Sequence, residues 1–168
     1  MFRFQPLRSL ATRLCLVAMF SLTFADFVRA ELFTWTGGGV DSNWSTGANW
    51  DTGSAPTTGD TLDFAGTTQA SSVNDLADGT TFGKIQFLNS TNTNFALSGN
   101  RMTLSGNLEV KDNGSGTFTH TIANNLTLSN INHQFYTYGD ESLVLSGNIS
   151  STDGTRNISK GGTGTLVL

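Results

Sequence analysis

The 168-residue sequence has one cysteine, two histidines and few charged side chains. The cysteine, Cys15, lies within the first thirty residues, so a chain that loses this segment has no disulfide and must be held by packing and backbone hydrogen bonds. No Gly-x-Ser-x-Gly sequence surrounds any serine. Nucleophilic hydrolysis therefore has no local support in the sequence.

Positive charge is also scarce. The whole chain has 9 Lys and Arg against 13 Asp and Glu, and four of the cations are Arg3, Arg8, Arg13 and Arg29. Beyond Ala30 the balance is 5 against 12, a net charge of −7. Such a surface repels phosphate, so we expect no nucleic acid among the partners.

The two histidines each have a structural explanation. His120 alternates with Phe118 and Ile122, which predicts a semi-buried position on a strand. His133 stands beside Gln134 near an expected corner, and we predict that it is solvated.

Two carboxylate pairs are candidates for a glycosidase site. Asp140 and Glu141 are adjacent, and Asp60 and Asp63 are an odd number of residues apart, so on a regular strand the members of each pair point to opposite faces. The sequence thus predicts no catalytic residue, no metal ligand and no cofactor, and we expect the protein not to be an enzyme.

The N-terminus has the layout of a secretory signal peptide. Residues 1–13 carry three arginines and no acid, residues 14–24 are almost wholly apolar, and small residues follow at Ala25 and Ala30. The apolar run of about eleven residues is too short for a membrane span, which needs about twenty. We predict a signal peptide over 1–30 that is cleaved after Ala30, with cleavage after Ala25 as the alternative.

A short phrase, Leu-x-Leu-Ser-Gly-Asn, recurs along the rest of the chain. It is clearest at 143–148, looser at 102–107 and 126–130, and begins again at 166–168. The second leucines stand at positions 104, 128, 145 and 168, and intervals of this size are in the range of solenoid coils. Apolar residues two apart share one face of a strand, and Ser-Gly-Asn favours a turn. These features predict an all-β, right-handed parallel β-helix or β-solenoid, with a β-sandwich or jelly roll as the alternative.

Short alternating runs continue this pattern through the middle of the chain. Residues 61–64 and 82–87 each place apolar side chains two apart, and turn residues cluster at 74–79, 89–94 and 112–116. We expect β-solenoid coils over 61–168, with the last repeat incomplete.

A segment rich in Trp and Gly, residues 31–60, precedes the coils. All three tryptophans of the protein, Trp35, Trp44 and Trp50, fall within sixteen residues here. One interpretation is an N-terminal cap, because the end of a solenoid must be covered. The other is a glycan contact, because exposed indole faces stack on sugar rings. The cap is favoured.

Two stretches resemble exported bacterial proteins that carry autotransporter-associated β-strand repeats. The first runs from Trp35-Thr-Gly-Gly-Gly through Asn43-Trp44-Ser-Thr-Gly-Ala-Asn-Trp50 to Pro56-Thr-Thr-Gly-Asp60. The second, 158–168, is similar to the start of the repeat, Lys-x-Gly-x-Gly-Thr-Leu-x-Leu-Ser-Gly, and ends before its Ser-Gly. The rest of the chain fits the family only in style.

The resemblance implies a non-enzymatic structural passenger, the N-terminal part of an exported stalk that is located at the bacterial surface or outer membrane, or is extracellular. Its implied partners are the export machinery and either downstream repeats or an outer-membrane barrel of a longer chain. A surface polysaccharide is a further partner under the alternative function, a carbohydrate-binding or carbohydrate-cleaving β-helix. The broken last repeat predicts a fragment or truncated product with an edge prone to pairing.

Overall fold

The protein is described from a computed structural model, which defines residues 29–88, 92–111, 116–129, 132–152 and 154–168. These residues form fifteen short strands and one 3-10 turn, η2 (Gly47–Asn49). The strands are β1 (Leu32–Trp35), β2 (Thr61–Phe64), β3 (Ser71–Asn74), β4 (Thr80–Phe82), β5 (Lys84–Leu88), β6 (Ala96–Gly99), β7 (Met102–Leu104), β8 (Leu108–Lys111), β9 (Thr119–Ile122), β10 (Leu126–Leu128), β11 (Asn132–Thr137), β12 (Ser142–Leu145), β13 (Ile149–Ser151), β14 (Asn157–Gly161) and β15 (Thr165–Val167).

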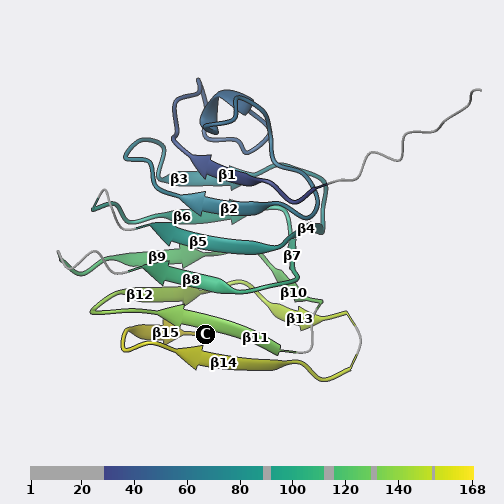
Figure 1. The fold of residues 1–168 in the computed structure, drawn as a ribbon, viewed down its shortest axis with the longest axis vertical. Coiled ribbons are helices and arrows are strands. Elements are labelled where there is room, and N and C mark those ends of the chain that lie inside the picture. The colour runs from purple at the N-terminus through teal and green to yellow at the C-terminus, as the bar shows by residue number, and fades with distance from the viewer. Residues whose placement is uncertain (1–28, 89–91, 112–115, 130–131, 153) are drawn as a thin grey trace, which may run out of the picture.

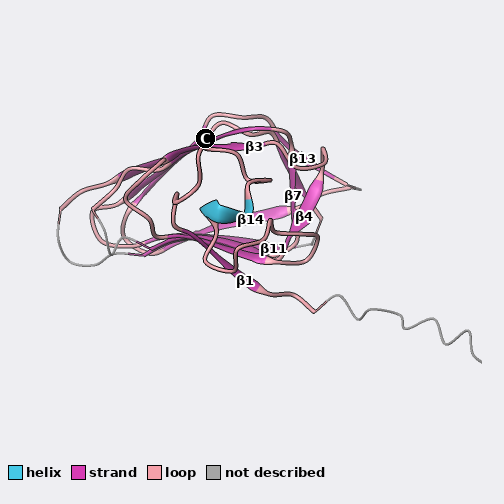
Figure 2. Cartoon of the chain, turned by 90° about the horizontal axis from the view of Figure 1, so that it is seen from above, coloured by secondary structure: helices cyan, strands magenta, loops and turns pink. Residues whose placement is uncertain are grey.

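The strands stack into three parallel sheets that run along the long axis of the molecule (Figure 1). Sheet A has the order β1-β2-β5-β8-β11-β14, sheet B the order β3-β6-β9-β12-β15, and sheet C the order β4-β7-β10-β13. From β2 onward the chain visits A, B and C in turn and then begins the next coil. Seen from above, the coils superimpose as a ring around one core (Figure 2). The protein is a parallel β-solenoid, as the sequence predicted.

The ladder registers repeat at nearly the same interval on all three sheets. Ile85 pairs with Leu108 on sheet A, Leu97 with Ile122 on sheet B, and Leu104 with Leu128 on sheet C. Each pair joins one coil to the next, so the three sheets advance together along the chain. The parallel pairing of Leu104 and Leu128 also excludes the β-sandwich and jelly-roll alternative, in which neighbouring strands are mainly antiparallel.

The recurring phrase marks corners on two different sheets. The copies at 102–107 and 126–130 lie on sheet C, whereas those at 143–148 and 166–168 lie on sheet B, where Val144 pairs with Val167. The shorter interval between Leu128 and Leu145 is therefore not a short coil. It is the path from sheet C of one coil to sheet B of the next. Because the phrase occurs on both sheets, the sequence alone does not show which sheet a given copy belongs to.

The apolar run at 82–87 is likewise two strands. Phe82 ends β4 and Lys84 begins β5, with a corner at Gly83 between them. One coil later, a Cβ on Gly106 would lie only 1.9 Å from the carbonyl oxygen of Gly83. Glycine at this corner lets successive coils approach closely, which the alternation of apolar residues does not reveal.

Side chains stack in columns along the inside of the coils. Sheet A contributes two buried columns: Phe33, Leu62, Ile85, Leu108 and Phe135, then Trp35, Phe64, Phe87 and Val110. Sheet B adds Leu97, Ile122 and Leu145, and sheet C adds Phe82, Leu104 and Leu128. Each coil places the same inward positions at the same point, so one narrow core is continuous through the stack.

The loop between β1 and β2 covers the first coil. It carries η2, which lies over the ring when viewed from above (Figure 2). The backbone amide of Asp51 donates to the carbonyl of Thr34, 2.9 Å, on the open edge of β1. On sheet B, the amide of Trp44 donates to Val73 O, 3.0 Å, above β3. The cap therefore occupies hydrogen-bonding groups on the upper edges of β1 and β3 as well as closing the core.

The opposite end has no such cover. β13, β14 and β15 are the last strands of their sheets, and no described strand pairs with their outer edges. Leu168 is 71% exposed and Val167 46%, whereas the equivalent Leu145 one coil earlier is buried. Within the described residues the solenoid is closed at its first coil and open at its last.

No helix among the described residues has the length and apolar character needed to cross a membrane. The predicted signal peptide falls almost entirely on residues 1–28, which lie outside the described part of the chain.

Candidate functional site

The three tryptophans form the underside of the cap. Trp35 and Trp44 are fully buried and Trp50 is 2% exposed. Trp50 packs edge-on against both other indoles, with ring centroids 5.1 Å from Trp35 and 6.0 Å from Trp44. The Nε1 of Trp44 donates to Ser72 Oγ on β3, 3.0 Å, and the Nε1 of Trp50 to Trp44 O, 2.8 Å. No indole face is left open to stack on a sugar, so the burial favours the cap over the glycan contact.

Asn49 holds the loop that carries these rings. Its side chain is buried, and Nδ2 donates to the carbonyls of Asp41 and Asn43 at 2.9 Å each, while Oδ1 accepts from Gly39 N at 2.8 Å. Every polar atom of this amide is therefore paired, which fixes the loop over the core.

His120 lies on β9 of sheet B, a strand position as its alternation predicted, but it is fully buried in the core rather than semi-buried. It stacks on Phe87, with Nδ1 accepting from the amide of Phe95 at 3.3 Å. Its Nε2 has no partner among the described residues. Burial lowers the pKa of His120 to about 4, so the ring is neutral at pH 7.

His133 is also buried, so the prediction that it is solvated is wrong. Its Nδ1 lies 2.7 Å from the carbonyl oxygen of Gly106, at a corner of the preceding coil. Its neighbour Gln134 is exposed, as expected for alternation on β11. The sequence position indicated a corner, but β11 already begins at Asn132, which turns His133 inward.

One carboxylate of each candidate catalytic pair, Asp60 or Glu141, accepts hydrogen bonds from backbone amides. Asp60 is 2% exposed and accepts hydrogen bonds from Thr57 and Glu31, and Glu141 is buried with Oε2 accepting from the amide of Phe118, 2.9 Å. Asp140 is exposed beside it.

The outward face of sheet A carries the densest group of charged side chains. Glu109 on β8 forms ion pairs with Lys84 on β5 through Oε2 and with Lys111 on its own strand through Oε1. Burial alone would raise the pKa of Glu109, but hydrogen bonds from Lys111 and Lys84 outweigh burial and lower it. The hydrogen bond to Glu109 in turn raises the pKa of Lys111.

Asp63 lies on the same outward row, two strands from Glu109. It is 9% exposed, and its Oδ1 has no partner among the described residues. Burial raises its pKa. A raised and a lowered carboxyl pKa on one face is the pattern of an acid and a base. Here, however, both oxygens of Glu109 are held by lysines, so this group is engaged in an ion network rather than available as a base.

Two tyrosines extend this face toward the last coils. Tyr136 and Tyr138 project from the same side of the chain, with ring centroids 5.8 Å apart and planes 8° from parallel, and Lys111 Nζ lies 5.7 Å from the Tyr138 centroid. Tyr136 covers Gly161, where a Cβ would come within 2.4 Å of its ring. Both tyrosines are partly exposed.

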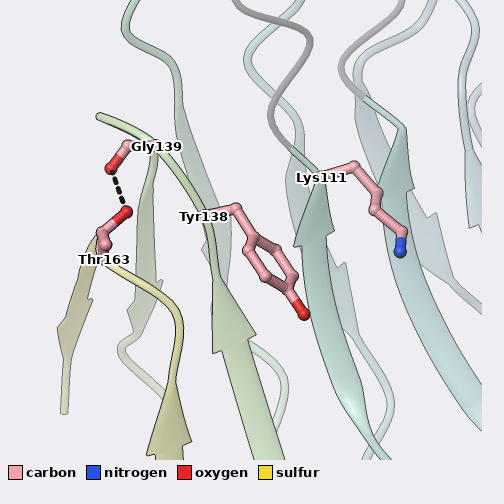
Figure 3. Close-up of a pocket in the computed structure, with 4 residues that line it drawn as sticks. All are labelled: Lys111, Tyr138, Gly139 and Thr163. Carbon is pink, nitrogen blue, oxygen red and sulfur yellow. Dashed lines mark hydrogen bonds between the residues drawn. The ribbon is translucent and has the colours of Figure 1, made fainter.

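Tyr138 lines a surface hollow with a volume of about 570 Å³, together with Lys111, Gly139 and Thr163 (Figure 3). Thr163 Oγ1 donates to the carbonyl of Gly139, 3.3 Å, and closes one side. An aromatic ring, a cation and hydroxyl groups around an open hollow are suited to a polar ligand with one apolar face, such as a pyranose.

The tyrosines and the Lys-Glu-Lys network are the site residues that sequence reasoning missed. A signal is present in Gln134-Phe135-Tyr136-Thr137-Tyr138, because a strand that turns the apolar Phe135 inward places both tyrosines on the outward face. No comparable signal brings Lys84 to Glu109, since their strands belong to successive coils.

In the described part of the chain, no three His, Cys, Asp or Glu side chains gather where they would hold a metal ion. No protein-family model, curated protein or solved structure matches the chain.

Proposed function

We propose that the chain is the N-terminal part of an exported, non-enzymatic stalk, similar to the passengers of autotransporter-like surface proteins. The observation that supports this function is the stack of in-register parallel coils, which begins under a cap on the upper edges of β1 and β3 and repeats the same three strands along one axis. A parallel edge of such a stack accepts another coil, so a downstream repeat would continue the rod.

The register of the last coil allows a sharp test. Val144 pairs with Val167, so Leu168 stands one full coil beyond Leu145. Appending a second copy of residues 146–168 after Leu168 therefore repeats one coil in register. We expect the added coil to fold and to raise the urea midpoint, because each coil of a solenoid stabilises its neighbour.

The matched control appends the same segment in scrambled order. It should leave the midpoint unchanged and be trimmed by protease back to the region of Leu168. Equal protease sensitivity of the two extensions would contradict the stalk function. Export is tested separately, by fractionating cells that express the full chain with its own leader.

A second candidate function is carbohydrate binding, favoured by the partly exposed Tyr138 ring beside Lys111 and the hollow that they line. The glycan contact then lies on Tyr138 and not on the buried tryptophans. We expect retention on an immobilised polysaccharide to fall at least tenfold in Tyr138→Ala. Phe33→Leu, a change inside the core, is the control for loss of packing. Equal retention of wild type and Tyr138→Ala would exclude this site.

A further inference from the structure

Glu31, the first residue after the predicted cleavage site, is hydrogen-bonded through both its amide and its carbonyl group. The amide nitrogen of Glu31 donates to Oδ1 of Asp60, 2.9 Å, and the carbonyl of Glu31 accepts from the amide of Thr61, 2.8 Å. These contacts place the Glu31 nitrogen at the edge of the first coil, directly before β1. The two preceding residues, Arg29 and Ala30, are exposed.

The carboxylate of Asp60 is buried and lacks a cationic partner. The residue is 2% exposed, and its Oδ2 accepts from the amide and the hydroxyl of Thr57 at 2.7 and 3.0 Å. No Lys, Arg or His of the described residues forms an ion pair with it. A buried carboxylate is costly unless a cation or several donors compensate it, and here the Glu31 nitrogen is the remaining donor at Oδ1.

We propose that cleavage of the Ala30–Glu31 bond converts this nitrogen into an α-ammonium that pairs with Asp60 and thereby completes the first coil. This inference rests on the proposed export, because the cleavage needs a peptidase of the export machinery. Water adds across the amide: Ala30 leaves with a new carboxylate, and Glu31 keeps the nitrogen, which takes a proton. The hydrogen bond that a neutral amide now donates to the Asp60 carboxylate becomes an ion pair without movement of the chain.

The ion pair has a predictable pH dependence. A free α-amino group has a pKa of about 8, and a buried carboxylate at hydrogen-bond distance raises it. Because the folded pKa lies above the unfolded one, the stabilisation is complete below about pH 8 and is lost as the pH rises through the folded pKa. Cleavage at the alternative site after Ala25 would leave five extra residues and no charge at this position.

The first measurement is the mass of the chain recovered from the periplasm or medium after expression of residues 1–168. The expected N-terminus is Glu31. An exported chain that begins at Asp26 would overturn the capture by Asp60 but leave the export intact. A chain that stays in the cytoplasm with residues 1–30 attached would contradict both.

The second measurement compares three processed chains: wild type, Asp60→Asn, and a variant with one alanine inserted between Ala30 and Glu31 whose mature form carries that alanine. The insertion keeps the Glu31 amide and moves the charge into solvent. We expect the wild-type urea midpoint to fall more between pH 8 and 10 than that of either variant. The excess fall should correspond to an α-amino pKa of Glu31 that folding raises by about one unit, which is a tenfold change in proton affinity. Superimposable profiles of wild type and insertion variant would overturn the inference.

Discussion

The imidazole of His120 stacks on the ring of Phe87 inside the solenoid, with centroids 4.5 Å apart and planes 17° from parallel. His120 is on sheet B and Phe87 on sheet A, so the contact crosses the core. It places a titratable ring where water does not reach.

This burial predicts a loss of stability in mild acid. The pKa of His120 is lowered to about 4 by burial, against about 6.5 in an unfolded chain. Between these pH values the imidazole of His120 binds a proton in the unfolded chain but not in the folded chain. The contribution of His120 to the free energy of unfolding is therefore complete above pH 6.5, and the free energy falls by about 3 kcal/mol as the pH drops to about 4. Urea titrations at pH 7 and 4.5 measure the fall. His120→Phe should reduce it, and an unchanged difference would contradict the assignment.

The aromatic cap predicts that the first coil depends on Trp44. Its ring contacts Trp50, Phe64 and Phe82, with centroids 5.6 to 6.0 Å away. Trp44→Ala should lower the free energy of unfolding by about 3–5 kcal/mol, because it leaves a cavity under the cap. Val40, which is 99% exposed, gives the control Val40→Ala, with a change within about 0.5 kcal/mol. Similar losses in both variants would argue against a buried cap.

Close approach of the coils predicts that replacement by alanine lowers the free energy of unfolding by different amounts at two glycines. A Cβ on Gly147 would lie 2.1 Å from the carbonyl oxygen of Asn124 in the coil above, whereas one on Gly154 meets nothing within 4 Å. Gly147→Ala should therefore cost about 3 kcal/mol, from overlap with backbone. Gly154→Ala should cost about 1 kcal/mol, since its φ of +67° is unfavourable for a side chain. Thermal unfolding ranks the two variants, and the reverse order would refute the packing of this corner.

The open end predicts that copies of the chain associate through this edge and that the positive charge of Lys160 limits the association. Lys160 on β14 stands in register with the buried Phe135 of β11, at an edge with no described partner strand. A lysine on an edge strand opposes edge-to-edge pairing. Lys160→Leu should increase the fraction of dimer and larger species in sedimentation velocity, while Lys160→Arg should not. Equal association of the two variants would mean that the charge has no such role.

The sequence predicted the fold class because a solenoid repeats its inward positions, and a strand such as 61–64 shows this alternation without tertiary information. It did not separate the sheets, since Leu104 and Leu145 stand in the same phrase on different faces. It misplaced His133 because strand boundaries depend on which corner the coil above provides. The outward network of Lys84 and Glu109 arises only when successive coils stack.

The central claim, a solenoid closed at its first coil and open at its last, is tested most directly by native-state hydrogen exchange read by NMR on the monomer. Amides of β2 and β5, with strands on both sides, should exchange slowest, and those of β1 should stay protected because the cap covers its edge. Amides of β13, β14 and β15 should exchange fastest of all the strands. Protection of β15 equal to that of β5, or exchange of β1 as fast as that of β14, would contradict the claim.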